Sequence, residues 1–188
     1  QRGIVRGGKR NHFSVIAPRG RAGLNRSGGA AMVAWPTSRA AQEQHEAAML
    51  AEWLEAQREI EERTGKPFDE VFVVGFSNGA YYAASLALRG RLAIAGVAVF
   101  AGGAGHGAPA AVKKDERVPV FVGVAGKDAT AEDSRALART LKKHGWPYRV
   151  ETRPVGHAIA DAHLDHAIAY LREQKDERTP RGDGASRP

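Results

Sequence analysis

The sequence contains no cysteine among its 188 residues. This absence excludes disulfides, thiolate metal ligands and a cysteine nucleophile, although it does not decide the compartment. Long hydrophobic runs are missing as well, because no apolar stretch approaches the roughly 20 residues of a membrane-spanning helix. No signal peptide is recognisable, although the first residue is Gln1 rather than methionine. With 43% hydrophobic residues, we expect one soluble cytoplasmic domain with a sizeable core.

Acidic residues are missing from the first 40 positions, which hold eight basic ones. Residues 41–172 contain 16 basic and 17 acidic residues, so the net charge of +7 belongs to one end of the chain. A duplex-binding face is therefore not supported, and we expect no nucleic-acid partner. The alternatives for this end are a solvated surface segment and a basic arm that touches phosphates. The eight basic residues are Arg2, Arg6, Lys9, Arg10, Arg19, Arg21, Arg26 and Arg39.

Strand and helix patterns alternate from residue 12 to residue 172. The expected strands are apolar on successive residues, which is typical of parallel strands covered on both faces. The amphipathic segments between them end at Gly or Pro. Alternating strands and helices indicate an α/β fold with a mostly parallel, doubly wound sheet flanked by helices. We expect strands over residues 12–17, 71–74, 95–101, 118–124 and 148–153, and helices over 39–63, 80–89, 130–144 and 160–172.

The two ends are expected to lie outside this α/β domain of residues 12–172. Residues 1–11 form a basic N-terminal segment, and residues 173–188, rich in charge with Pro, Gly and Ser, are expected to be disordered. Residues 19–31 are rich in Gly and Arg and are expected to form a loop. In the helix over 39–63, the inward stripe is Leu50, Trp53, Leu54 and Ile60, and the helix over 130–144 opens on a Thr-x-x-Asp capping signal at Thr130.

A glycine-flanked serine follows the strand over 71–74. Residues 75–79 read Gly-Phe-Ser-Asn-Gly, which fits the G-x-S-x-G nucleophile elbow of α/β-hydrolases. A strand that turns abruptly into a helix brings backbone close to backbone, so Gly75 and Gly79 stand where a Cβ would collide. The serine is left exposed at the tip of the turn. This motif predicts Ser77 as a nucleophile.

A serine nucleophile needs a histidine base and a carboxylate that orients the histidine. In α/β-hydrolases the chain order is Ser, Asp or Glu, then His, and the last two follow later strands. Asp128 follows the strand over 118–124, and His157 follows the strand over 148–153, so both belong to the carboxyl edge of the sheet. The order and the positions predict a triad of Ser77, Asp128 and His157.

The polar residues near the C-terminus also allow alternatives to this triad. His157, Asp161, His163, Asp165 and His166 could form a metal site, but positions 161, 163 and 166 of one helix point in different directions. Asp161 could replace Asp128 as the acid, although it follows the histidine in the chain instead of preceding it. A further histidine, His106, lies in a Gly-rich loop at a strand end and either lines the pocket or is exposed to solvent.

With these residues identified, the chain resembles the phospholipase/carboxylesterase family of α/β-hydrolases, which includes acyl-protein thioesterases and small bacterial esterases. Residues 15–19 (Val-Ile-Ala-Pro-Arg) and 28–35 (Gly-Gly-Ala-Ala-Met-Val-Ala-Trp) are similar to the family's strand, proline and Gly-Gly loop with Met-x-x-Trp. The Gly-Phe-Ser-Asn-Gly, Gly-Lys-Asp and Gly-His motifs match its elbow, acid loop and histidine loop. The resemblance covers residues 12–172. It implies the same triad, an oxyanion donor in the Asn78 backbone N–H, and a place for Trp35 beside the acyl-binding cleft.

The chain departs from that family in two places. Asn78 stands where the family usually has Gln. The family also has a strand that ends in a His-Gly loop before the stretch that begins here at His12, and this strand is central to the sheet and gives a second oxyanion donor. Residues 1–11 contain neither feature. We therefore expect an α/β-hydrolase-type sheet that lacks the first strands of the usual fold, in a chain that is incomplete at its N-terminus.

The function that follows is hydrolysis of a small-molecule carboxylic ester through an acyl-enzyme. The resemblance extends the substrate classes to thioesters and lysophospholipids. The chemistry needs no metal and no organic cofactor. The alternative is a non-catalytic or truncated hydrolase-fold protein with an incomplete oxyanion hole, because removal of one donor typically lowers the rate on the order of a hundred- to a thousandfold.

Overall fold

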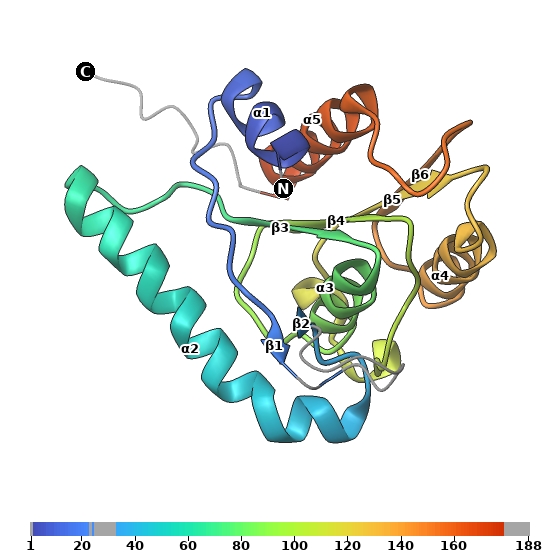
Figure 1. The fold of residues 1–188 in the computed structure, drawn as a ribbon, viewed down its shortest axis with the longest axis horizontal. Coiled ribbons are helices and arrows are strands. Elements are labelled where there is room, and N and C mark those ends of the chain that lie inside the picture. Colours follow the sequence, from blue (N-terminus) through green and yellow to red (C-terminus); the bar gives the residue numbers. More distant parts are fainter. Residues whose placement is uncertain (1, 23, 25–32, 179–188) are drawn as a thin grey trace, which may run out of the picture.

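A computed structural model describes residues 2–22, 24 and 33–178, and its centre is a parallel sheet (Figure 1). Four strands follow one another in the order β3-β4-β5-β6, and all neighbours are parallel. The two inner strands are buried along their whole length, as their continuous apolar sequences predict. The predicted α/β fold with a mostly parallel sheet is therefore confirmed. The strands are β3 (Phe72–Phe76), β4 (Gly96–Phe100), β5 (Val120–Ala125) and β6 (Tyr148–Arg153).

Helices cover both faces of this sheet. On one face, α3 (Asn78–Leu88) and α4 (Ala131–Lys143) pack against the valines of β4 and β5. On the other face, α5 (Asp161–Arg178) buries Leu164, Ile168 and Leu171 against Phe100 and Phe121. Two short 3₁₀ turns, Pro109–Ala111 and Lys114–Glu116, connect β4 to β5. None of the helices in the described ranges is long and apolar enough to cross a membrane.

The long helix α2 (Arg39–Thr64) begins at Ser38, whose Oγ accepts a hydrogen bond from the Ala41 N–H, and ends at Gly65 with φ +74°. Its first half packs on α3, and its second half continues past α3 along the left side of Figure 1. The predicted inward stripe is therefore wrong in part: Leu50 is buried, whereas Leu54 is 53% exposed. A two-stranded antiparallel ladder, β1 (Arg21–Ala22) with β2 (Val33–Ala34), lies beside the start of α2.

Two predictions about the outer segments need correction. Residues 12–17 form no strand, and Ser14 to Pro18 make no backbone hydrogen bond to any other described segment. The N-terminal basic segment, for which no secondary structure was predicted, forms the helix α1 (Arg2–Arg10). At the other end, α5 continues to Arg178, well beyond the predicted end at residue 172. Most of the predicted loop over 19–31 and the tail over 179–188 lie outside the described residues, and the domain boundaries stay a prediction.

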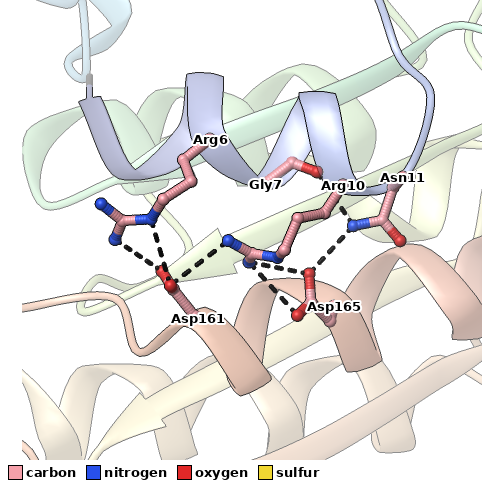
Figure 2. Close-up of polar contacts among 6 residues, drawn as sticks. All are labelled: Arg6, Gly7, Arg10, Asn11, Asp161 and Asp165. Atoms are coloured by element: carbon pink, nitrogen blue, oxygen red, sulfur yellow. Dashed lines mark hydrogen bonds and ion pairs between the residues drawn. The ribbon is translucent and has the colours of Figure 1, made fainter.

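Ion pairs hold α1 against the beginning of α5, as Figure 2 shows. Arg6 donates hydrogen bonds from Nη2 and Nε to the two carboxylate oxygens of Asp161, at 3.0 and 3.2 Å. Arg10 reaches Asp161 at 3.3 Å and Asp165 at 3.0 Å. The Asn11 side chain donates to Asp165 at 2.9 Å. The alternative of a phosphate-binding arm would have to break these pairs, because Arg6 and Arg10 already face carboxylates.

We expect the double substitution Arg6→Gln/Arg10→Gln to release α1 from α5 without unfolding the sheet. The paired side chains are 35% to 62% exposed, so salt screens them. The hydrogen bond from Arg6 and the charge of Arg10 hold the pKa of Asp161 below its ordinary value. The stabilisation that these arginines give through Asp161 is therefore present above the unfolded-state pKa of this carboxyl. It is lost as pH falls through the lowered pKa of the folded state.

The measurement is hydrogen exchange of the α1 amides, which should be about three- to tenfold faster in the double variant. Molar salt should have the same effect on the wild type. Arg39→Gln breaks a matched exposed pair with Glu43 in α2 and should leave α1 unchanged. Unaltered α1 exchange in the double variant would show that the ion pairs do not hold the helix.

Candidate active site

The predicted nucleophile stands on a strained turn between β3 and α3. Ser77 has φ +54° and ψ −125°, a conformation that non-glycine residues rarely adopt and that clusters at functional sites. Gly75 makes the turn possible, because a Cβ there would lie 2.4 Å from the Gly79 carbonyl oxygen and 2.8 Å from Ala80 Cα. Gly79 is less constrained than predicted, because a Cβ added there would meet only the Trp35 side chain, at 3.2 Å.

The structure brings Ser77, His157 and Asp128 together at the carboxyl edge of the sheet. Ser77 Oγ lies 2.9 Å from His157 Nε2, and His157 Nδ1 lies 2.8 Å from Asp128 Oδ2. A carboxylate only accepts hydrogen bonds, so Nδ1 carries the proton and Nε2 faces the serine as an acceptor. The His157 ring lies beside Phe76, with ring centroids 4.8 Å apart, and its side chain is 48% exposed. The histidine is therefore both oriented and accessible.

Asp128 is fixed from the side opposite His157. Its Oδ1 accepts hydrogen bonds from the Thr130 hydroxyl at 2.5 Å and the Thr130 N–H at 2.8 Å, and its side chain is only 8% exposed. The hydroxyl of Thr130, its N–H and then His157 lower the pKa of Asp128, so this carboxyl stays ionised at neutral pH. Thr130 was predicted to cap α4, but its hydroxyl makes no capping bond and serves Asp128 instead.

The loop that carries His157 is tied to the loop that carries Asp128. The Lys127 N–H donates to the Val155 carbonyl at 2.9 Å, and the Gly126 N–H donates to the Arg153 carbonyl at 2.8 Å. These bonds continue the pairing of β5 with β6 beyond the strands themselves. The base and the acid are therefore positioned by one backbone ladder.

Asn78 begins α3, where the first backbone N–H groups of a helix have no partner within the helix and can bind an anion. Its side chain has a role that the motif did not predict. Asn78 Oδ1 accepts a hydrogen bond from the Trp35 N–H at 2.6 Å, which ties the end of β2 to the elbow. The Trp35 ring stacks on Tyr82 at 5.9 Å and packs edge-on against Trp53 at 5.6 Å.

The residues of the alternative metal site do not converge. Asp161 and Asp165 face α1, the buried His163 donates from Nε2 to the Glu151 carbonyl, and His166 binds the Glu151 carboxylate. Burial lowers the pKa of His163, which keeps this ring neutral. Asp161 lies at the α1 contact, whereas Asp128 contacts His157. His106 is exposed, and its N–H donates to the Thr37 carbonyl.

A second carboxylate near the elbow escaped the sequence reasoning. Tyr81, one helical turn after Ser77, donates its hydroxyl to Asp133 at the start of α4. Burial and then this hydrogen bond raise the pKa of Tyr81 to about 12, so it remains a donor at neutral pH. In the sequence, only the spacing of one helical turn between Ser77 and Tyr81 could have indicated that Tyr81 lies near the nucleophile.

Comparisons with known proteins identify the fold and the family of this chain. Among solved structures, a carboxylesterase from Mesorhizobium loti has a TM-score of 0.64 at 22% identity, over 90% of this chain and 81% of that one. Arabidopsis thaliana SOBER1 has a TM-score of 0.59 at 17% identity, over 88% and 86%. These likenesses show a shared α/β-hydrolase fold. No curated protein sequence matches. The profile of the dienelactone hydrolase family matches residues 26–179, and the chain therefore belongs to that family.

Proposed function

We propose that this hydrolase cleaves carboxylic esters through an acyl-enzyme formed on Ser77. The observation that carries the proposal is the hydrogen-bonded chain from Ser77 through His157 to Asp128. His157 takes the proton of Ser77 Oγ as the hydroxyl attacks the ester carbonyl, and it returns this proton to the leaving alkoxide. Asp128 stabilises the imidazolium that forms. Water then repeats the sequence and releases the acid.

The Asn78 N–H at the beginning of α3 is the proposed oxyanion donor, and it acts together with the positive end of the helix dipole. Trp35 is proposed to contact the acyl group, because it packs against Gly79 beside the elbow. The named neighbours include a carboxylesterase, which supports an ester over other acyl substrates. Thioesters and lysophospholipids offer the same carbonyl chemistry and stay within the proposal.

The test is labelling with a fluorophosphonate probe, which reacts with activated serines. We expect the wild type to be labelled and Ser77→Ala to remain unlabelled, because the label attaches to this hydroxyl. Ser14→Ala removes an exposed serine far from the triad in sequence and should label like the wild type. If the folded wild type failed to label, the result would instead support a non-catalytic hydrolase-fold protein. The argument for this alternative is that only one oxyanion donor is predicted.

A further inference from the structure

The loop that carries His157 is held differently at its two ends. It connects β6 to α5 over residues 154–160 (Figure 1). On the β6 side, the Val155 carbonyl accepts a hydrogen bond from the Lys127 N–H. On the α5 side, the backbone of residues 156–160 makes no hydrogen bond to any described residue outside the loop and α5. The position of His157 on this side therefore depends on how α5 is held.

His163 ties the first turn of α5 back to β6. This residue is only 1% exposed, and its Nε2 donates a hydrogen bond to the Glu151 carbonyl at 2.9 Å. A carbonyl oxygen only accepts hydrogen bonds, so Nε2 carries the proton of the neutral ring. His157 stands midway between Glu151 and His163 in the chain. The bond therefore closes the base of the loop that carries His157.

The surroundings of His163 are otherwise apolar. Its ring centroid lies 5.5 Å from that of Phe100 and 6.1 Å from that of Phe121. Gly123 of β5 leaves room for the ring, because a Cβ there would lie 3.3 Å from His163 Cε1. Burial of a polar side chain costs free energy unless a hydrogen bond compensates it. Among the described residues, the Glu151 carbonyl is the one hydrogen-bond partner of this side chain.

Two side-chain contacts near this bond also join β6 and α5, but water reaches them. His166 Nδ1 lies 2.8 Å from one carboxylate oxygen of Glu151, and Arg153 Nε donates to the other oxygen at 2.5 Å. The His166 side chain is 55% exposed, so solvent competes with these contacts. Water cannot replace the buried hydrogen bond of His163 in the same way. The bond from His163 is therefore the contact best able to fix this end of the loop.

We propose that His163 is a positioning residue for the reaction, which holds the loop of His157 in place through its hydrogen bond to the Glu151 carbonyl. This role rests on the proposed function, because it requires His157 to act as the base. A displacement of about 1 Å at a reacting group can lower the rate on the order of a hundredfold. Loss of the bond should therefore lower kcat and change KM little, since His163 acts through the loop backbone.

The test compares two substitutions of His163 in the full chain. His163→Met keeps a flexible apolar side chain that fills the site but cannot donate a hydrogen bond, whereas His163→Gln supplies an amide donor near the position of Nε2. With p-nitrophenyl acetate, we expect His163→Met to lower kcat about tenfold and to leave KM within about twofold of the wild type. His163→Gln should restore kcat to within about threefold of the wild type, because the donor is present again.

Proton NMR tests the position of His157 without turnover. The Nδ1–H that His157 donates to Asp128 should give a low-field signal in the wild type. We expect this proton to exchange with water at least about tenfold faster in His163→Met and to be retained in His163→Gln. Nitrogen NMR of the wild type should also show His163 as the neutral Nε2–H tautomer at neutral pH. This last measurement does not depend on the folding of any variant.

Leu171→Val is the matched control for a loss of stability. Leu171 is also buried on α5, but it packs near Gly96 at the beginning of β4, away from the loop of His157. The control should lower the melting temperature, as His163→Met also should. It should nevertheless leave kcat and the exchange of the His157 proton within about twofold of the wild type.

Unchanged kcat and unchanged exchange of the His157 proton in His163→Met would overturn the proposal. Equal losses of kcat in Leu171→Val would also overturn it, because they would show a general effect of stability. A protonated His163, or its Nδ1–H tautomer, at neutral pH would contradict the assigned hydrogen bond. If the wild type hydrolysed no ester, the proposed function would fail, while the NMR comparison of the His163 variants would still decide whether this bond fixes the loop.

Discussion

Replacing Asp128 with asparagine is expected to lower ester turnover by about four orders of magnitude. The carboxylate now accepts the Nδ1–H of His157 at 2.8 Å and thereby leaves Nε2 free to accept the Ser77 proton. An amide at this position can donate to Nδ1, which stabilises the tautomer with its proton on Nε2. That tautomer cannot act as a base toward Ser77. The fold should be unaffected, because the amide retains an acceptor for Thr130.

Turnover of p-nitrophenyl acetate measures the effect in the Asp128→Asn variant. Asp133→Asn is the matched control, since this carboxylate also lies near the elbow but binds Tyr81 instead of His157. We expect it to retain activity within about tenfold of the wild type. Thr130→Val should give an intermediate loss, because it removes one of the hydrogen bonds that fix Asp128. Equal losses in the Asp128 and Asp133 variants would contradict the assigned roles.

The sheet and the grouping of the three site residues could be predicted from local sequence. The continuous apolar runs of β4 and β5 are typical of strands buried on both faces, and the parallel sheet brings their carboxyl ends to one edge. Asp128 and His157 follow from this topology, because each comes directly after a strand. The contacts of His157 with Ser77 and with Asp128 could therefore be expected from strand order and motif position alone.

Other features depended on partners that the sequence pattern does not reveal. Gly3, Gly7 and Gly8 make α1 a poor helix by propensity. The helix forms because Gly7 permits close contact with Leu164, where a Cβ would lie 2.3 Å from Cδ2, and because its arginines meet Asp161 and Asp165. Residues 12–17 have the composition of a strand, but within the described ranges they have no neighbouring strand with which to form a ladder, and a strand without a partner does not persist.

Replacing Glu46 with glutamine is expected to lower the free energy of unfolding by about 3 to 5 kcal/mol, because it leaves a largely buried arginine unpaired. The Glu46 side chain is 4% exposed and bridges α2 to the end of α3. Its two oxygens accept hydrogen bonds from Arg89 at 2.5 and 2.9 Å, and Arg91 adds a third at 3.1 Å. The Arg89 side chain is itself only 14% exposed.

The same pair predicts a loss of stability in acid. Burial by itself would raise the pKa of Glu46, but the hydrogen bonds and the charge of Arg89, together with Arg91, outweigh burial and lower it. A lowered folded-state pKa stabilises the fold above the unfolded-state value, and this stabilisation is lost as pH falls through the lowered pKa. Urea unfolding at neutral and acidic pH should therefore show that the wild type approaches Glu46→Gln as the pH falls.

The paired substitution Glu46→Met/Arg89→Met separates the value of the ion pair from the cost of leaving one charge alone. Removing both charges together often leaves stability unchanged or improved, so the double variant should be more stable than Glu46→Gln. Glu43→Gln, which breaks an exposed pair with Arg39 one helical turn earlier, should cause no measurable change. If Glu46→Gln were as stable as Glu43→Gln, the contact between α2 and α3 would have to rest on the apolar side chains of Met49, Leu50, Tyr82 and Leu86 and on the hydrogen bond from Gln42 to Ser85.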